Sequence, residues 1–394
     1  MKIRQIKPGE REQIALVYNN AFRPPLEMTR EWAKSSDLSN TRAIFEGTRL
    51  VSMLQILPYS LWIGGNEISM GGIAGVATWA DCQGKGYASM LMKDSLEVMR
   101  ERAQWVSALY PFSHKYYGKF GWASAGHRIK YINVQQHHFT PFAERALVTA
   151  DDHAWDITTL NTVYESMAKT YNLCLKRTKK MWKNKLDSLK KNNGQVYLIR
   201  DGKKAIGWFF CQNIRDHGGY FNESLTNEFA FTDQTAALAM MGFLSILPTN
   251  VKTITLLAPY SLNLWHYFKE PFIETRLQPE MQFRIVDIER AGKARGYKQG
   301  ISGKICIALK DTYAPWNQGT WCIDVQDGKN TKCAKTGAKP DIECDIQAFS
   351  QLFCGYVTAE RLIWEGKLSV NDHSKIQLLN ELFNDQPTHM QDWF

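Results

Sequence analysis

Apolar runs separated by glycines mark out the elements of the first part of the chain. The run from 73 to 79 predicts a buried strand, because it is apolar and short and is followed by a polar, glycine-containing segment. Apolar residues recur at helical spacing from Tyr87 to Met99 and predict an amphipathic helix. A glycine loop, Gln83-Gly84-Lys85-Gly86, therefore joins a strand to a helix.

The same pattern predicts further strands on both sides of this loop. Arg42 to Phe45 with Leu50 to Tyr59, and Leu61 to Ile63 with Glu67 to Met70, are expected as two antiparallel pairs with glycine turns. Trp105 to Leu109 predicts another buried strand, and a tyrosine-rich segment follows it. These elements indicate a mixed α/β domain over residues 1–145.

Two further segments follow, with their own periodic patterns. Residues 146–290 repeat a strand–helix–strand layout, but Thr232-Asp233-Gln234-Thr235 stands where a glycine loop would be, and Asp233 would repel a phosphate. This segment is expected to be a degenerate copy of the first. The glycine-containing stretch Ala291 to Gly296 is a plausible linker. Beyond it, strands and three short helices over 291–394 resemble the sterol-carrier-protein-like fold, which we expect to be structural here.

The charge pattern adds one basic segment. The net charge is +9, and much of the excess lies between Leu175 and Lys191. We interpret that run as the solvated face of a helix whose apolar side carries Met181, Trp182, Leu186 and Leu189. A nucleic-acid role is not expected, because no nucleic-acid-binding motif accompanies the charge.

Cysteine spacing and the N-terminus narrow the class of protein. The eight cysteines form no Cys-x-x-Cys pair, so they are expected to be reduced structural thiols, without a metal site. We expect a cytoplasmic protein with no membrane partner, because the first residues lack a signal-peptide core and no apolar run is long enough to span a membrane.

The glycine loop has the chemistry of an anion site. A loop that opens a helix presents backbone N–H groups at the positive end of the helix dipole, which suits a pyrophosphate. The spacing fits neither a Walker loop, which needs Gly-Lys-Ser/Thr, nor a dinucleotide fingerprint, which needs a third glycine. Taken alone, the loop could equally be an ordinary strand-to-helix turn.

Two sequence motifs together indicate what the glycine loop binds. Gln83, Gly86 and Ala88 match the pattern Gln/Arg-x-x-Gly-x-Gly/Ala, which resembles the acyl-CoA loop of GCN5-related N-acetyltransferases (GNAT). Tyr116-Tyr117-Gly118-Lys119-Phe120-Gly121-Trp122 resembles the tyrosine element of the same family. Combined with a degenerate copy and a sterol-carrier-like tail, the whole chain resembles the Eis family, named for enhanced intracellular survival.

That resemblance implies a fold, an activity and partners. The expected fold is α+β, with tandem GNAT-fold domains followed by a sterol-carrier-protein-like domain. The expected activity is transfer of acetyl from acetyl-CoA, as a co-substrate, to a small-molecule primary amine, without a metal. Some family members acetylate aminoglycosides at several amino groups, and members look like hexamers.

The resemblance also implies site residues. Tyr117 matches the tyrosine that protonates the leaving thiolate, and its neighbour Tyr116 is the alternative. The carboxylate of the last residue, Phe394, would be the general base, although a frayed tail is the plain alternative. The acetyl-CoA site would be formed by Val76, Ala77, Thr78, Gln83, Gly84, Lys85, Gly86, Tyr87, Ala88, Ser89, Phe112 and Ser113.

The acceptor is the open question at this stage. Phe22 and Trp32 could supply an apolar wall for the amine, and Glu27, Glu31 and Asp37 could supply negative charge. A lysine side chain of a protein or peptide is another acceptor class. The alternative from a different class is a non-catalytic CoA- or lipid-binding scaffold, against which the intact loop and Tyr117 both argue.

Overall fold

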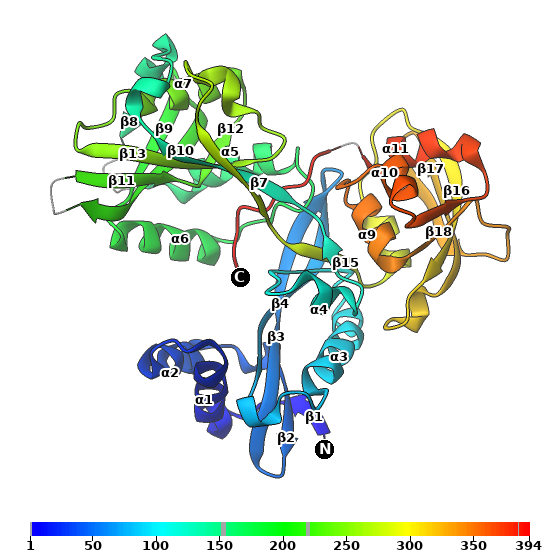
Figure 1. Ribbon diagram of the computed structural model, residues 1–394. Coiled ribbons are helices and arrows are strands. Elements are labelled where there is room, and N and C mark those ends of the chain that lie inside the picture. The colour runs from blue at the N-terminus through cyan, green and yellow to red at the C-terminus, as the bar shows by residue number, and fades with distance from the viewer. Residues whose placement is uncertain (1, 151–154, 218–220, 385) are drawn as a thin grey trace. The chain divides into compact units, whose positions relative to one another are not determined.

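The computed structural model of the chain describes residues 2–150, 155–217, 221–384 and 386–394. Contacts group the chain into two compact units (Figure 1). The first contains Met1–Ala125, Met281–Asp385 and Trp393–Phe394, and the second contains Gly126–Glu280 and Gln386–Asp392. The division into three domains at 145 and 290 remains a prediction. The two units are described in turn.

A seven-stranded sheet forms the N-terminal part of the first unit. Its order is β1-β2-β3-β4-β5-β15-β6, and all neighbours are antiparallel except β4 and β5. The strands are β1 (Lys2–Gln5), β2 (Thr41–Glu46), β3 (Arg49–Ile63), β4 (Asn66–Thr78), β5 (Val106–Leu109), β15 (Gln282–Ile285) and β6 (Ala123–Ser124).

Strands β3 and β4 form one long hairpin (Figure 1). Both strand pairs expected from the sequence are present, but their strands are longer than predicted, because β3–β4 pairing runs without a break from Ile63↔Asn66 through Leu57↔Gly72. Glycines inside a strand often mark a close approach of another group. A Cβ on Gly71 would meet Met99 at 2.3 Å, and one on Gly72 would meet the Phe394 ring at 2.7 Å.

The parallel pair β4–β5 opens partway along its length. The two strands pair from Met70↔Val106 to Ile73↔Leu109, where β5 ends while β4 continues to Thr78. Next to this point Gly75 has a left-handed φ of 56°, and the β3–β4 register shifts. The shift indicates a bulge, which bends a strand locally. Beyond Ile73, β4 therefore stays paired with β3 but no longer pairs with β5 on its other side.

Helices cover this sheet and supply its core. Helix α3 (Tyr87–Glu101) buries Leu91, Met92, Leu96 and Met99, which follow the helical spacing expected from the sequence. Helices α1 (Arg11–Phe22) and α2 (Leu26–Ser35) pack against each other, and the short helix α4 (His114–Gly118) precedes β6.

Strand β15 joins the first sheet from a distant part of the chain. It lies between β5 and β6, although more than 150 residues of chain separate it from β6. Arg284 on this strand is fully buried and forms an ion pair with Asp311 at 2.7 Å. The guanidinium also donates to the carbonyl of Phe120, so it fastens β15 to the segment after α4.

A five-stranded sheet completes the first unit. Its order is β18-β17-β16-β19-β20, and the parallel pair is β16–β19. The strands are β16 (Gly303–Lys310), β17 (Gly319–Gln326), β18 (Lys329–Lys335), β19 (Ile342–Asp345) and β20 (Leu368–Val370). The helices are α8 (Ile288–Ala294), α9 (Ile346–Phe353), α10 (Ala359–Trp364) and α11 (Ile376–Phe383).

The second unit is built on an eight-stranded sheet. Seven strands follow the order β14-β7-β13-β11-β10-β9-β8, and β12 pairs with β10. The strands are β7 (His127–Val134), β8 (Val148–Ala150), β9 (Gln195–Asp201), β10 (Lys204–His217), β11 (Phe221–Thr226), β12 (Phe229–Phe231), β13 (Val251–Pro259) and β14 (Glu274–Pro279). The helices are α5 (Ile157–Ala168), α6 (Lys179–Lys191) and α7 (Gln234–Leu244).

The last residues of the chain run through the second unit without regular secondary structure. Thr388 forms an isolated parallel bridge with Asn172, and residues 388–392 are all buried. Chain termini are usually frayed and exposed. This tail is therefore held by specific contacts, which are described below.

Two sequence expectations about composition can be compared with the structure. All eight cysteines lie in the described ranges as unpaired thiols, and seven of them are buried. Within the residues that the structure describes, no helix is long and apolar enough to cross a membrane.

Candidate functional site

The glycine loop forms an open cradle at the start of α3. Gly84 and Gly86 have left-handed φ angles of 79° and 82°, which disfavour any residue with a side chain. Within the described residues, no atom lies within 4 Å of a Cβ built on either glycine. The first hydrogen bond of the helix runs from Met90 N–H to Gly86 O, so the earlier N–H groups face out of the helix end. The cradle therefore fits a pyrophosphate.

A cavity of about 680 Å³ lies over this loop. Most of the residues predicted to bind acetyl-CoA line it, together with the predicted acceptor residue Phe22. The lining consists of Ala21, Phe22, Val76, Thr78, Cys82, Gln83, Gly84, Gly86, Tyr87, Ala88, Ser89, Phe112 and Tyr116. It thus joins the end of α1, the free part of β4, the loop and the segment before α4. Its size is in the range of small-molecule sites.

Three of the predicted cofactor residues have other surroundings. Ala77 is buried in the core formed with α1 and β3. Ser113 caps α4 by accepting the Tyr116 N–H at 3.2 Å. The Lys85 ammonium lies 3.6 Å from the Glu46 carboxylate and is about half exposed.

Glu46, which sequence analysis missed, connects the loop to β2. The Tyr87 hydroxyl donates a hydrogen bond to this carboxylate, which raises the pKa of Tyr87 to about 12. The same bond, with Lys85 nearby, lowers the pKa of Glu46. Glu46 thus holds the first residue of α3 and partly neutralises Lys85. The sequence offers only a glutamate at the end of a strand, which is no signal for this contact.

Tyr117 lies beside the cavity, in the core of the first unit. It is only 4% exposed, and burial raises its pKa above the ordinary value, with Tyr116 adding to the effect. The Tyr116 and Tyr117 rings meet edge to face at 5.1 Å, and Phe112 packs on both. Tyr116 lines the cavity, and burial raises its pKa as well. Both phenols therefore stay protonated at neutral pH.

The last residue of the chain lies where β4 and β5 separate. The Phe394 ring is 5.1 Å from the Tyr59 ring and 5.5 Å from the ring of Tyr110, the residue that follows β5. Trp393 stacks on Tyr110 at 3.8 Å. Gly72 leaves room for the Phe394 ring, because a Cβ there would stand 2.7 Å from it.

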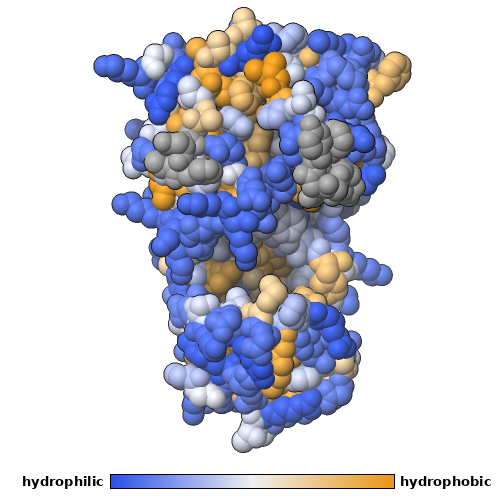
Figure 2. Space-filling model, turned by 90° about the vertical axis from the view of Figure 1, so that its left-hand side faces the viewer, coloured by the Kyte–Doolittle hydropathy of each residue, from blue (hydrophilic) through white to orange (hydrophobic). Residues whose placement is uncertain are grey.

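The residues proposed for the acceptor wall do not all come together. Trp32 packs on Tyr18 at 4.5 Å, and Tyr18 packs on Phe22 at the same distance. Only Phe22 of these lines the cavity described above. In Figure 2, the part of the surface formed by α1 and α2, at the bottom of the view, carries mainly hydrophilic side chains.

The three acidic candidates already have partners. Glu27 pairs with Arg30 and Glu31 with Lys34, each at 2.7 Å. Asp37 accepts the Ser39 N–H at 2.9 Å. These contacts use the carboxylates locally, so they give no support for a polycation pocket built from them. Among the described residues, no group of three or more His, Cys, Asp and Glu is placed to hold a metal ion.

The second unit repeats the local layout without the cradle. Strands β11 and β13 are parallel, and α7 connects β12 to β13, as α3 connects β4 to β5. At the start of α7, the Asp233 carboxylate accepts the Ala236 N–H at 3.0 Å. A negative side chain therefore occupies the helix end that α3 leaves open. This contrast supports the proposal that residues 146–290 are a degenerate copy.

The first testable prediction concerns the cradle. Gly86→Ala is expected to raise KM for acetyl-CoA about tenfold, with kcat within about twofold, because a left-handed alanine costs ~1–3 kcal/mol and the loop would relax away from the phosphate. Steady-state kinetics with varied acetyl-CoA would measure this. Gly202→Ala is the matched control, since Gly202 is also left-handed at φ 56° with open space around it but lies in the β9–β10 turn. A normal KM in Gly86→Ala would contradict the role of the loop.

Comparisons with known proteins agree with this geometry. The model of the acetyltransferase (GNAT) domain family matches residues 2–125, and the model of the sterol carrier protein domain family matches residues 288–391. A comparison with curated protein sequences found no match. The mixed α/β fold with a GNAT domain first and a sterol carrier domain last is thereby confirmed.

Solved structures match over the whole length. A GCN5-related N-acetyltransferase from Anabaena variabilis is 22% identical with a TM-score of 0.90, and each chain is covered completely. A GCN5-related N-acetyltransferase from Kribbella flavida is 19% identical with a TM-score of 0.83, over 100% of this chain and 98% of that one. Eis1 from Mycobacterium abscessus is 19% identical with a TM-score of 0.83, over 100% of both chains.

These matches confirm the expected enzyme class, an acetyl-CoA-dependent N-acetyltransferase, and the resemblance to the Eis family is confirmed in the fold. The chain carries a GNAT acetyltransferase domain followed by a sterol carrier protein domain, and its fold is similar over the whole length to that of Eis1 from Mycobacterium abscessus.

Proposed function

We propose that this protein moves the acetyl group of acetyl-CoA to a primary amine of a small molecule, with Tyr117 as general acid and the Phe394 carboxylate as general base. The observation that carries the proposal is the cavity of about 680 Å³, which joins the cradle of Gly84 and Gly86 to Tyr116, whose ring meets the Tyr117 ring edge to face. Bound in this cavity, acetyl-CoA would supply an activated thioester carbonyl.

The chain's own groups would handle the protons. The amine nitrogen forms a bond to the acetyl carbon while the bond from that carbon to sulfur breaks. The amine gives up a proton, which a carboxylate can accept, and the departing thiolate needs one, which a phenol can donate. Burial keeps Tyr117 protonated, so the proton is available at neutral pH.

Phe394 is proposed as the base for two reasons. Its ring packs on Tyr59 and Tyr110 at the point where β4 and β5 separate. The other acidic candidates of the first segment, Glu27, Glu31 and Glu46, are engaged by cations or by Tyr87. The carboxylate of the last residue would supply an acid group at that end of the sheet, so no acidic side chain would be needed there.

The acceptor class stays broad. Aminoglycosides, polyamines and lysine-containing peptides are all primary amines, and aminoglycosides enter through the family resemblance alone. The hexamer and the cytoplasmic location likewise remain proposals from that resemblance and from the sequence.

The test is release of free thiol from acetyl-CoA with this amine panel, for wild type, Tyr117→Phe and Tyr116→Phe. We expect amine-dependent turnover in wild type and a kcat about 100-fold or more lower in Tyr117→Phe, because general acid catalysis contributes about 10² to 10⁴ in rate. Tyr116→Phe keeps the neighbouring ring and should retain most of the activity.

Two outcomes would overturn parts of the proposal. Loss of activity in Tyr116→Phe with a normal Tyr117→Phe would transfer the acid role to Tyr116. Binding of acetyl-CoA without turnover on any amine would favour the alternative function, a CoA- or lipid-binding scaffold.

A further inference from the structure

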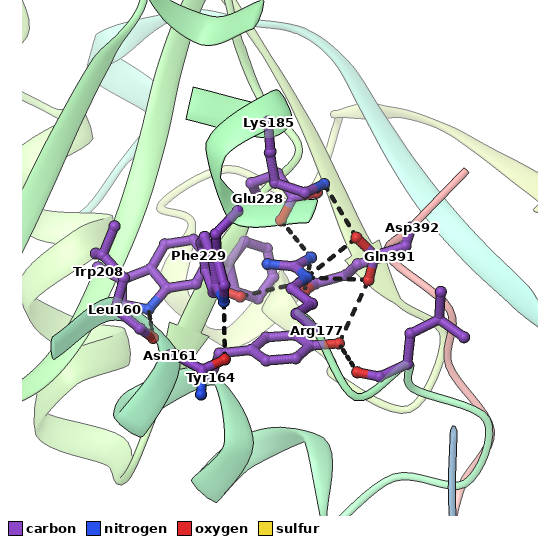
Figure 3. Close-up of polar contacts among 12 residues, drawn as sticks. Leu160, Asn161, Tyr164, Arg177, Lys185, Trp208, Glu228, Phe229, Gln391 and Asp392 are labelled. Atoms are coloured by element: carbon purple, nitrogen blue, oxygen red, sulfur yellow. Dashed lines mark hydrogen bonds and ion pairs between the residues drawn. The ribbon is translucent and has the colours of Figure 1, made fainter. Parts of the chain in front are cut away.

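The C-terminal tail is held in the second unit by a buried charge cluster. Arg177 donates from Nε to both carboxylate oxygens of Asp392 at 3.0 Å, and from Nη2 to Glu228 at 2.9 Å (Figure 3). The Lys185 ammonium contacts Glu228 at 2.5 Å and Asp392 at 3.2 Å. We call Arg177, Lys185 and Glu228 the tail clamp.

The clamp is almost completely removed from solvent. The Arg177 side chain is 0% exposed, that of Asp392 4% and that of Glu228 6%, whereas Lys185 is 21% exposed. The guanidinium also lies 3.9 Å over the Tyr164 ring and 4.7 Å from the Trp182 ring. A buried ion cluster must be complete, because removing one member leaves an uncompensated charge in a low-dielectric site.

The charges of the clamp support each other. Burial alone would raise the pKa of Asp392, but Arg177 and Lys185 lower it to about 2. Asp392 is therefore ionised at neutral pH, in keeping with its contacts with Arg177 Nε and the Lys185 ammonium. Asp392 and Glu228 together balance the two positive charges of Arg177 and Lys185.

Further contacts hold the rest of the tail on the same unit. The Gln391 amide donates to the carbonyl of Phe229 at 2.9 Å, and the His389 N–H donates to the carbonyl of Asn172 at 2.9 Å (Figure 3 shows the first). The His389 ring contacts the Glu280 carboxylate at 3.1 Å and the Tyr171 ring. The tail thus follows one fixed path up to Asp392.

The covalent chain links this path to the first unit. Asp392 belongs to the second unit, and the next two residues, Trp393 and Phe394, belong to the first, where they pack on Tyr110 and Tyr59. Anchoring of Asp392 leaves only two residues of freedom before the terminal carboxylate.

We infer that the tail clamp is a positioning device: Arg177, Lys185 and Glu228 fix Asp392 and thereby hold the Phe394 carboxylate in place for acetyl transfer. This inference rests on the proposed function of the terminal carboxylate. It assigns the second domain, the proposed degenerate copy, a part in catalysis. It also assigns Arg177 and Lys185, within the basic segment 175–191, a role other than exposure to solvent. A displacement of about 1 Å in a reacting group can reduce rate about 100-fold.

The test uses Asp392→Asn in the full-length chain. This variant removes the tail's charge but leaves Arg177 and Lys185 paired with Glu228. The first measurement is release of Phe394 and Trp393 by carboxypeptidase, followed by mass spectrometry without any substrate present. Release needs the tail to open locally, so we expect it to be about tenfold or more faster than in wild type.

The second measurement is kinetic. We expect kcat for amine acetylation to fall about tenfold, while KM for acetyl-CoA stays within about twofold, because the cradle is untouched. Lys185→Met, which removes one cation of the clamp, should show a smaller effect in both assays. Lys183→Met is the matched control, since Lys183 is an exposed lysine of the same helix and should behave as wild type.

The possible outcomes test the clamp and its positioning role separately. Unchanged carboxypeptidase release in Asp392→Asn would overturn the clamp. Faster release with an unchanged kcat would overturn its positioning role. Three residues added after Phe394 separate the two proposals, because full activity in that variant rejects the terminal carboxylate as base, while carboxypeptidase release in Asp392→Asn still reports on the clamp.

Discussion

Three residues added after Phe394 are expected to lower kcat at least about 100-fold and to leave thermal unfolding unchanged. The extension moves the terminal carboxylate by as much as about 10 Å, at ~3.3 Å per extended residue, and so removes the proposed base. The Phe394 ring would keep its contacts with Tyr59 and Tyr110, since side-chain packing does not need a free terminus. Thiol release from acetyl-CoA measures the loss.

The control is the same three residues placed before the first residue, which should be fully active. Gly72→Ala offers a second route to the same result at constant chain length, because its Cβ would stand 2.7 Å from the Phe394 ring and push it aside. Full activity in the C-terminally extended protein would reject the terminal carboxylate as base.

The largest stability effect is expected from Arg177→Met. It should lower the free energy of unfolding by about 3 to 5 kcal/mol at neutral pH, because Asp392 and Glu228 would remain buried with only Lys185 to balance them. Urea unfolding followed by tryptophan fluorescence measures it, with Trp182 beside the clamp as an internal reporter.

The loss should shrink in acid. The folded pKa of Asp392, about 2, lies below its ordinary value of 3.8, so its contribution to stability is present above about pH 4 and disappears as pH falls towards 2. The gap between wild type and Arg177→Met should narrow over that window. Adding Glu228→Gln and Asp392→Asn to Arg177→Met should restore part of the stability. A loss below about 1 kcal/mol for the single variant would contradict the described burial of the cluster.

The local part of the candidate site could be predicted from the sequence. Gln83 to Ser89 are contiguous, so the loop, the helix start and their anion chemistry can be read from neighbouring residues, and the structure places most of them around one cavity. Three of the four residues predicted for the apolar face of α6 are buried, namely Trp182, Leu186 and Leu189, whereas Met181 is only partly buried. Periodicity is reliable when all members of a face lie on one element.

The clamp could not be predicted in the same way. Arg177 meets Glu228 at a separation of 51 residues and Asp392 at a separation of 215. In sequence, Arg177 and Lys185 are two cations in a basic run. Interpreting Arg177 as solvated was wrong, and Lys185 is only partly exposed, because the buried acids that pair with them come from elsewhere. The full length of the β3–β4 hairpin was missed for a related reason, since its interior glycines make room for Met99 and Phe394 rather than ending a strand.

The position of β15 in the first sheet has a consequence for biosynthesis. Strand β6 ends at Ser124, but β15, which lies between it and β5, ends at Ile285. A ribosome that adds roughly 5 to 20 residues per second needs about 8 to 30 s for the ~160 residues between them. Throughout that interval one edge of β5 lacks its partner strand β15. Exposed strand edges promote association between chains. We therefore expect the nascent GNAT sheet to depend on chaperones until residue 285 has emerged, and a fragment ending near residue 125 to aggregate when it is expressed alone.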